Sequence, residues 1–70
     1  MFIKLTEERT HRALYVDVGR IIYFAEIQDA GELDGKSVIE LDANLRESHN
    51  VIESCIEIYN LIKSIRKVYQ

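Results

Sequence analysis

Few side chains in this sequence are of the types that carry out covalent chemistry. Cys55 is the single cysteine, and His11 and His49 are the two histidines. Cys55 falls on an apolar helical seam, where a thiol behaves as a small hydrophobic side chain; a nucleophilic cysteine needs an exposed, electropositive setting. His11 lies in a charged turn and His49 beside a predicted helix start, and no spacing brings either to Cys55. We therefore predict that the protein is not an enzyme.

Carboxylates near two glycines are the next candidates for chemistry. Asp29, Glu32 and Asp34 surround Gly31 and precede Gly35, an arrangement with a faint similarity to a calcium loop. The spacing does not fit an EF-hand, because the bidentate glutamate is missing at the required offset. Zinc-ligand spacing, a phosphate-binding glycine loop and a nucleophile elbow are also missing. We expect no metal and no cofactor.

The charge of the chain is mildly acidic and unevenly distributed. Nine Lys and Arg residues against 12 Asp and Glu residues give a net charge of −3, so the basic excess of a nucleic-acid-binding protein is missing. The acidic middle is interpreted as a solvated surface or, alternatively, as an interaction patch that opposes a basic partner. Its members are Glu26, Asp29, Glu32, Asp34, Glu40 and Asp42.

The length of 70 residues fits one small domain, residues 1–70. A chain this short buries only about 60% of the surface that its unfolded form exposes, so added stabilisation is expected. One cysteine excludes an intramolecular disulfide and favours a reducing compartment. The opening MFIKLTEERT is too short and too charged for a signal-peptide core or a membrane span. We expect a cytoplasmic protein without membrane insertion.

The hydrophobic period is near two before residue 48 and near three and a half after it. This predicts an α+β fold, in which residues 1–47 form a β-meander and residues 48–70 one long amphipathic C-terminal helix. The meander is one small antiparallel sheet of four to five short strands, with a turn at 7–12 and a loop at 28–35. The strands are expected at residues 2–6, 13–18, 21–27 and 36–41, with a partial strand at 43–48.

Both faces of the third predicted strand are apolar. Strict alternation places Ile21, Tyr23 and Ile27 on one face and Ile22 and Phe24 on the other. A strand that is apolar on both faces is usually covered on both. We therefore expect the face of Ile22 and Phe24 to meet a partner.

The predicted helix carries more apolar surface than one small sheet needs. Its seam has a spacing of four, three, four, three and four residues, and flanking apolar residues widen it beyond the roughly 100° of an ordinary surface helix. Ser48 or Asn50 is the expected N-cap, with Asn50 and Glu53 spaced as a capping box. The seam consists of Val51, Cys55, Ile58, Ile62, Ile65 and Tyr69, and Ile52, Ile56, Tyr59, Leu61 and Val68 widen it.

Two arrangements account for the excess apolar surface. Either a strongly curved sheet wraps the helix, or part of the seam meets a second copy of the chain or another protein. Leaving several Ile-sized side chains exposed forgoes roughly 1.5–3 kcal/mol each, so we predict self-association, with a dimer favoured. The predicted interface comprises Ile22, Phe24, Val51, Cys55, Ile58, Tyr59, Ile62, Ile65 and Tyr69.

Four segments of the chain are similar to a known family. FIKLT, LYVDVGRIIYFAEI, SVIEL and LRES before an apolar helix resemble the FlbD-like flagellar and swarming-motility proteins and their relatives in bacterial prophages. Members begin with an I-x-L-T strand and close with a V-x-E-S element that enters a helix. The matching positions are Ile3, Leu5 and Thr6, then Val16, Asp17, Ile21, Phe24 and Ala25, then Ile39 and Leu41, and finally Leu45, Glu47 and Ser48.

The resemblance implies a small non-enzymatic accessory or regulatory protein of bacterial or phage origin. Combined with the helix, it gives our leading hypothesis of a module that acts by protein–protein interaction, on itself or on a host protein. One alternative is a phage inhibitor that uses the acidic middle against a host protein. The other is a nucleic-acid-binding β-domain, disfavoured by the net charge, that would use Arg9, Arg12, Arg20, Tyr15 and Tyr23.

Overall fold

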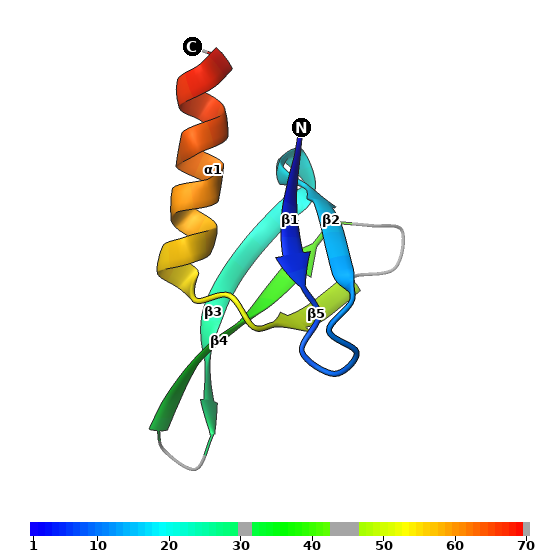
Figure 1. The fold of residues 1–70 in the computed structure, drawn as a ribbon, viewed down its shortest axis with the longest axis vertical. Coiled ribbons are helices and arrows are strands. Elements are labelled where there is room, and N and C mark those ends of the chain that lie inside the picture. The colour runs from blue at the N-terminus through cyan, green and yellow to red at the C-terminus, as the bar shows by residue number, and fades with distance from the viewer. Residues whose placement is uncertain (30–31, 43–46, 70) are drawn as a thin grey trace.

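The structure, a computed structural model, describes the backbone of residues 1–29, 32–42 and 47–69, and the side chains of residues 1–27, 35–42 and 47–65. The described residues form five strands, one short 3₁₀ helix and one C-terminal α-helix, and Figure 1 shows their arrangement. The elements are β1 Phe2–Thr6, β2 Ala13–Asp17, the 3₁₀ helix η1 Val18–Arg20, β3 Ile21–Asp29, β4 Glu32–Leu41, β5 Glu47–Val51 and α1 Cys55–Tyr69. The predicted α+β class is confirmed.

The first two strands form the predicted hairpin. β1 and β2 are antiparallel, with Ile3 opposite Val16 and Leu5 opposite Leu14. Because directly opposite residues share a face, these four apolar side chains lie on the inner face of the pair. The turn at 7–12 is also confirmed: the amide of Glu7 donates to the carbonyl of Arg12 over 2.9 Å.

The predicted single sheet is wrong, because the strands form two antiparallel sheets. One contains β1 and β2, and the other has the order β3-β4-β5. Among the described residues, backbone hydrogen bonds connect the two sheets where β1 ends beside β5. There the amide of Glu8 donates to the carbonyl of Asn50 over 2.9 Å, and the amide of Ile52 donates to the carbonyl of Thr6 over 3.0 Å. The local patterns identify the strands but not this discontinuity, which depends on contacts between distant residues.

The segment 28–35, predicted as a loop, is mostly strand. β3 continues to Asp29 and β4 begins at Glu32, so only residues 30–31, outside the described part, separate them. Gly35 has φ of +79°, a conformation that glycine adopts without a Cβ penalty. Because glycine adopts this conformation readily, β4 continues through Gly35, a residue that the sequence pattern assigned to a loop. The partial strand predicted at 43–48 falls largely outside the described residues, and β5 begins at Glu47.

The predicted division of β3 into two strictly alternating faces is also wrong. The pairing with β4 shifts between Ile21 and Tyr23, because Ile21 lies opposite Leu41 and Tyr23 opposite Glu40. One extra residue in a strand reverses the side-chain alternation beyond it. Ile21 and Phe24, three positions apart, therefore both pack against the core, while Ile22 and Tyr23 are both exposed.

The predicted long helix is wrong, because α1 begins seven residues later than predicted and spans the 15 residues Cys55–Tyr69. Residues Glu47–Val51 pair with β4 as β5, and the backbone of the predicted cap Asn50 is part of that strand. The actual capping box is formed by Ser54 and Glu57. The Ser54 hydroxyl accepts from the Glu57 amide over 3.2 Å, and the Ser54 amide donates to Glu57 Oε1 over 3.4 Å. The S-x-x-E sequence at 54–57 therefore marks the start, rather than Asn50 and Glu53.

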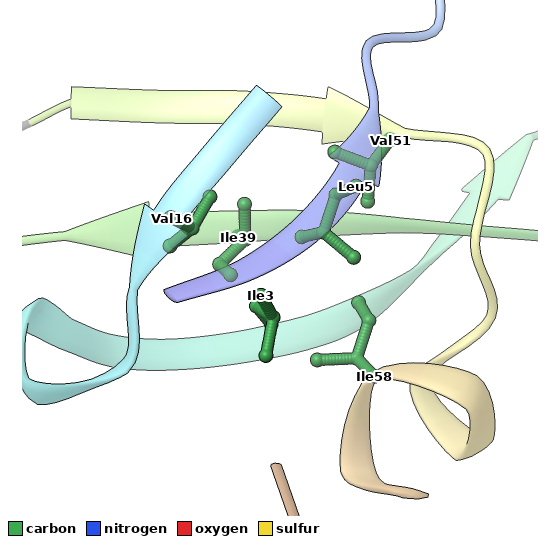
Figure 2. Close-up of a cluster of buried hydrophobic side chains, with 6 residues drawn as sticks. All are labelled: Ile3, Leu5, Val16, Ile39, Val51 and Ile58. Atoms are coloured by element: carbon green, nitrogen blue, oxygen red, sulfur yellow. The ribbon is translucent and has the colours of Figure 1, made fainter. Parts of the chain in front are cut away.

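The hydrophobic core joins both sheets to the helix, as Figure 2 shows. Each of β1, β2, β4, β5 and α1 contributes at least one fully buried side chain. These residues are Ile3, Leu5, Val16, Ile39, Val51 and Ile58. Leu14, Val18, Ile21, Phe24, Leu41, Ile62 and Ile65 are partly buried against them. The helix is therefore an integral part of the domain and not an appended arm.

Candidate interaction groove

The helix is fixed to the strands near its first turns. Ile58 is fully buried in the core, whereas Ile62 and Ile65, further along the same seam, are only half-buried. In Figure 1 the C-terminal turns of α1 rise beyond the strands. The part of the predicted seam that lies on α1 therefore faces the domain itself, and among its described side chains only Ile58 is completely covered.

A carboxylate fixes the approach to the helix. Glu53 Oε1 accepts from the Thr6 amide over 2.9 Å, and Glu53 Oε2 accepts from the Thr6 hydroxyl over 3.0 Å. Residues 47 positions apart are thus joined at the end of β1. The sequence analysis assigned Glu53 to a capping box, so this role was missed.

An apolar groove of about 290 Å³ lies between the helix and β3. Its lip is formed by Ile22, Tyr23 and Tyr59, which are 46%, 49% and 51% exposed. The complete lining is Val18, Ile21, Ile22, Tyr23, Phe24, Tyr59 and Ile62. All seven lining residues carry apolar or aromatic side chains, and polar backbone and hydroxyl atoms of these residues also face the groove.

The bulge in β3 builds one wall of this groove. Because the alternation shifts at Ile21, the consecutive residues Ile22 and Tyr23 are both exposed, and Ile21 and Phe24 fill the floor from the core side. The sequence analysis identified Ile22, Phe24, Tyr59 and Ile62, and the structure brings these four together. It missed Val18, Ile21 and Tyr23, because a bulge changes no residue type and leaves no sequence signal of its own.

Two predicted interface residues are wrong. Val51 lies in β5, not on the helix, and both Val51 and Ile58 are fully buried inside this chain. A partner cannot contact side chains that are already enclosed. Cys55 is half-buried at the first turn of α1, with its Sγ 3.3 Å from Ser37 Oγ. Ile65 is half-buried on the seam, and the side chain of Tyr69 lies outside the described residues.

The predicted acidic patch is divided. Glu26 is opposite Ser37, whereas Asp42 follows Leu41, which is opposite Ile21, so the two exposed carboxylates lie at different ends of the β3–β4 ladder. Glu40 is half-buried between them in β4. The side chains of Asp29, Glu32 and Asp34 lie outside the described residues. The predicted patch grouped residues that are close in sequence. Because β3 and β4 are antiparallel, Glu26 and Asp42 lie at opposite ends of the strand pair.

The candidate chemical residues have structural partners. Cys55 faces Ser37, and His49 Nε2 lies 3.4 Å from the exposed carboxylate of Glu47. Within the described side chains, no three His, Cys, Asp or Glu residues form a group able to hold a metal ion. Lack of enzymatic activity and of a cofactor remains a prediction.

The residues of the nucleic-acid alternative are dispersed. Arg9 and Arg12 belong to the β1–β2 turn, whereas Arg20 Nε donates to the carbonyl of Asp42 over 2.9 Å. Tyr15 and Tyr23 belong to different sheets. No observation on these residues favours a nucleic-acid function.

Comparisons with protein-family models, curated proteins and solved structures found no match to this chain. The FlbD-like resemblance therefore stays a prediction based on the strand residues. No helix among the described residues is long and apolar enough to cross a membrane.

Proposed function

We propose that the chain is a small non-enzymatic accessory or regulatory protein that acts by protein–protein interaction and forms a homodimer through the groove between β3 and α1. The observation that carries this proposal is the groove itself. Its lip residues Ile22, Tyr23 and Tyr59 are each about half exposed and adjoin a lining that is entirely apolar or aromatic. Side chains of these types are the ones enriched at the buried centres of interfaces.

The surface area of the chain supports the same proposal. Its accessible surface is 5288 Å². A compact monomer of this mass is expected to expose about 4,500 Å², so the excess is roughly 750 Å². One partner in a standard-size interface contributes about 800 Å². The elongated shape, 41 × 27 × 21 Å, contributes to this excess, so the area is compatible with one dimer contact but does not locate it.

A second copy is the simplest occupant, because it brings an identical apolar lip. Most soluble oligomers are two-fold symmetric dimers in which both copies use the same patch. The FlbD-like resemblance is in line with an accessory protein of bacterial or phage origin, acting in the cytoplasm. A host protein that takes the place of the second copy is the competing outcome of the experiment below.

The experiment is sedimentation equilibrium over a concentration series, with groove and control variants. We expect a dimer for the wild type. Ile22→Glu and Tyr59→Glu should yield folded monomers, because each places a charge on the apolar lip. Ile56→Glu is the matched control, since Ile56 is 68% exposed on α1 and lies outside the groove.

Circular dichroism establishes that each variant keeps the wild-type fold. A wild type that remains monomeric up to about 1 mM would contradict the homodimer, since association weaker than that is worth less than about 4 kcal/mol. Equal dimerisation by wild type and both groove variants would contradict the groove as the interface.

A further inference from the structure

The two ends of the groove carry opposite charges. β3 and α1 run in opposite directions along it, as Figure 1 shows. The end where α1 begins is therefore the end toward which β3 proceeds. Each end can be assigned to one sign of charge from the residues beside the apolar lining.

The acidic end contains Glu26. This exposed residue follows Phe24 by two positions in a regular stretch of β3, so both side chains are on the same face. Glu26 is opposite Ser37, whose hydroxyl contacts Cys55 in the first turn of α1. These contacts place Glu26 at the end of the groove where the helix starts.

The basic end contains Lys63 and Arg20. Lys63 lies one helical turn beyond Tyr59, and its Nζ is 5.6 Å from the centre of the Tyr59 ring. Arg20 immediately precedes β3, and its Nε donates to the carbonyl of Asp42, which holds the guanidinium near the start of the strand. Lys63 and Arg20 are both exposed. The exposed carboxylate of Asp42 also lies at this end, so two cations outweigh one anion there.

We propose that two copies pair groove to groove in antiparallel alignment, about a two-fold axis perpendicular to the groove, so that Lys63 and Arg20 of each copy oppose Glu26 of the other. This inference rests on the proposed homodimer and specifies its geometry. A two-fold axis along the groove would instead place Glu26 beside Glu26 and Lys63 beside Lys63. Like charges in apposition oppose binding, whereas complementary charges fix register. Each favourable contact occurs twice, because both copies contribute the same surface.

Charge reversal tests the alignment. In the antiparallel dimer, Glu26→Lys alone and Lys63→Glu alone each create two repulsive contacts, so each should weaken homodimerisation by about tenfold or more. An equimolar mixture of the two variants should form heterodimers in which both contacts between positions 26 and 63 are attractive. The double variant Glu26→Lys/Lys63→Glu should dimerise more strongly than either single variant but less strongly than the wild type, because its new lysine still opposes the unchanged Arg20.

Two controls separate charge from other effects. Lys63→Met keeps the hydrophobic stem but removes the cation from the Tyr59 ring, and it should weaken the dimer less than Lys63→Glu does. Raising the salt concentration should weaken the wild-type dimer and strengthen the homodimers of both single variants, because screening acts on attraction and repulsion alike.

The outcomes distinguish the alignment from the dimer itself. Suppose that the wild type dimerises and that Ile22→Glu abolishes dimerisation. If the single charge reversals then leave dimerisation unchanged, or if the double variant dimerises no more strongly than the single variants, the antiparallel alignment is wrong and the groove interface stands. If the wild type is monomeric, both proposals fail. Sedimentation equilibrium of unlabelled samples, with native mass spectrometry of the mixture, provides these measurements.

Discussion

The two sides of α1 differ in their surroundings: the side toward β1 is attached to the domain by hydrogen bonds, and the side toward β3 is the proposed contact side. Toward β3, the space beside the helix is lined only by apolar and aromatic side chains. Toward β1, a groove of about 380 Å³ is lined by Lys4, Glu53, Glu57, Asn60 and Leu61. The second groove is the larger one, yet only one of its five lining residues is apolar. The two grooves therefore differ in the types of their side chains, and this difference, rather than volume, is the basis for proposing the β3 side as the interface.

The difference originates in the strands. β1 is regular, and at its end the Thr6 amide and hydroxyl both donate to Glu53. Those polar groups thereby acquire partners within the chain. β3 is bulged, so two consecutive apolar side chains, Ile22 and Tyr23, are exposed beside the helix. On the β1 side the polar groups of Thr6 and Glu53 bond to each other, whereas on the β3 side apolar side chains are exposed.

The largest expected effect belongs to Ile58, which anchors the helix between its two sides. Ile58→Glu places a carboxylate where the side chain is fully buried. Burying an unpaired charge costs more than about 4 kcal/mol, comparable to the whole stability of a domain of this length. We expect loss of the folded state by circular dichroism. Ile56→Glu, the same change on the exposed side of the helix, should remain folded; cooperative unfolding of Ile58→Glu at the wild-type temperature would contradict the anchoring role.

An intermediate effect is expected at the β1 side. Glu53→Ala removes both hydrogen bonds to Thr6 and should lower the free energy of unfolding by about 1–3 kcal/mol, since bonds to a charged group are stronger than neutral ones but this pair is only partly buried. Urea denaturation measures the change. A double-mutant cycle with Thr6→Val isolates the part that belongs to the hydroxyl contact. Additive effects in that cycle would show that the contact contributes nothing to stability.

Self-association should survive Glu53→Ala at protein concentrations where the variant is folded. This outcome would separate the attachment side from the contact side, because the groove residues are unchanged. A monomeric but folded Glu53→Ala protein would instead show that both sides of the helix contribute to the interface.

The sequence predicts the local elements of this fold better than their assembly. Alternation identifies β1 and β2, and the seam residues Ile58, Ile62 and Ile65 do face the domain. The helix start was misplaced because Asn50 and Glu53 have capping spacing as well as Ser54 and Glu57, and only strand pairing decides between them. Val51 fits the helical spacing of the seam but belongs to β5. Residues that precede the N-cap can thus match the helical period without being part of the helix.

The candidate site was predictable in part for a physical reason. Exposed apolar residues such as Ile22 and Tyr59 were found because residue type reveals an excess of apolar surface. Tyr23 and Ile21 were assigned to one face, since strict alternation is the default for a strand. The bulge that places them on different faces is defined by the pairing of β3 with β4. It can be assigned only when the partner strand and its register are known.

The smallest expected effect is at Leu61, the only apolar residue lining the groove on the β1 side. Leu61 is 38% exposed and is thus less accessible than Tyr59. Leu61→Glu should leave the dimer dissociation constant unchanged. The groove beside Leu61 is lined mainly by polar residues, among them Glu53, which is already hydrogen-bonded to Thr6, so it offers a second copy little apolar area. Its free energy of unfolding should change by no more than about 1 kcal/mol, as for most partly exposed positions.

The pair Leu61→Glu and Tyr59→Glu therefore tests the contrast directly, since the two residues lie on the same helix two positions apart and receive the same charge. Sedimentation equilibrium should show a dimer for the first and a monomer for the second. Equal loss of association in both variants would mean that the interface extends around the helix, and the distinction between its two sides would then have no functional meaning.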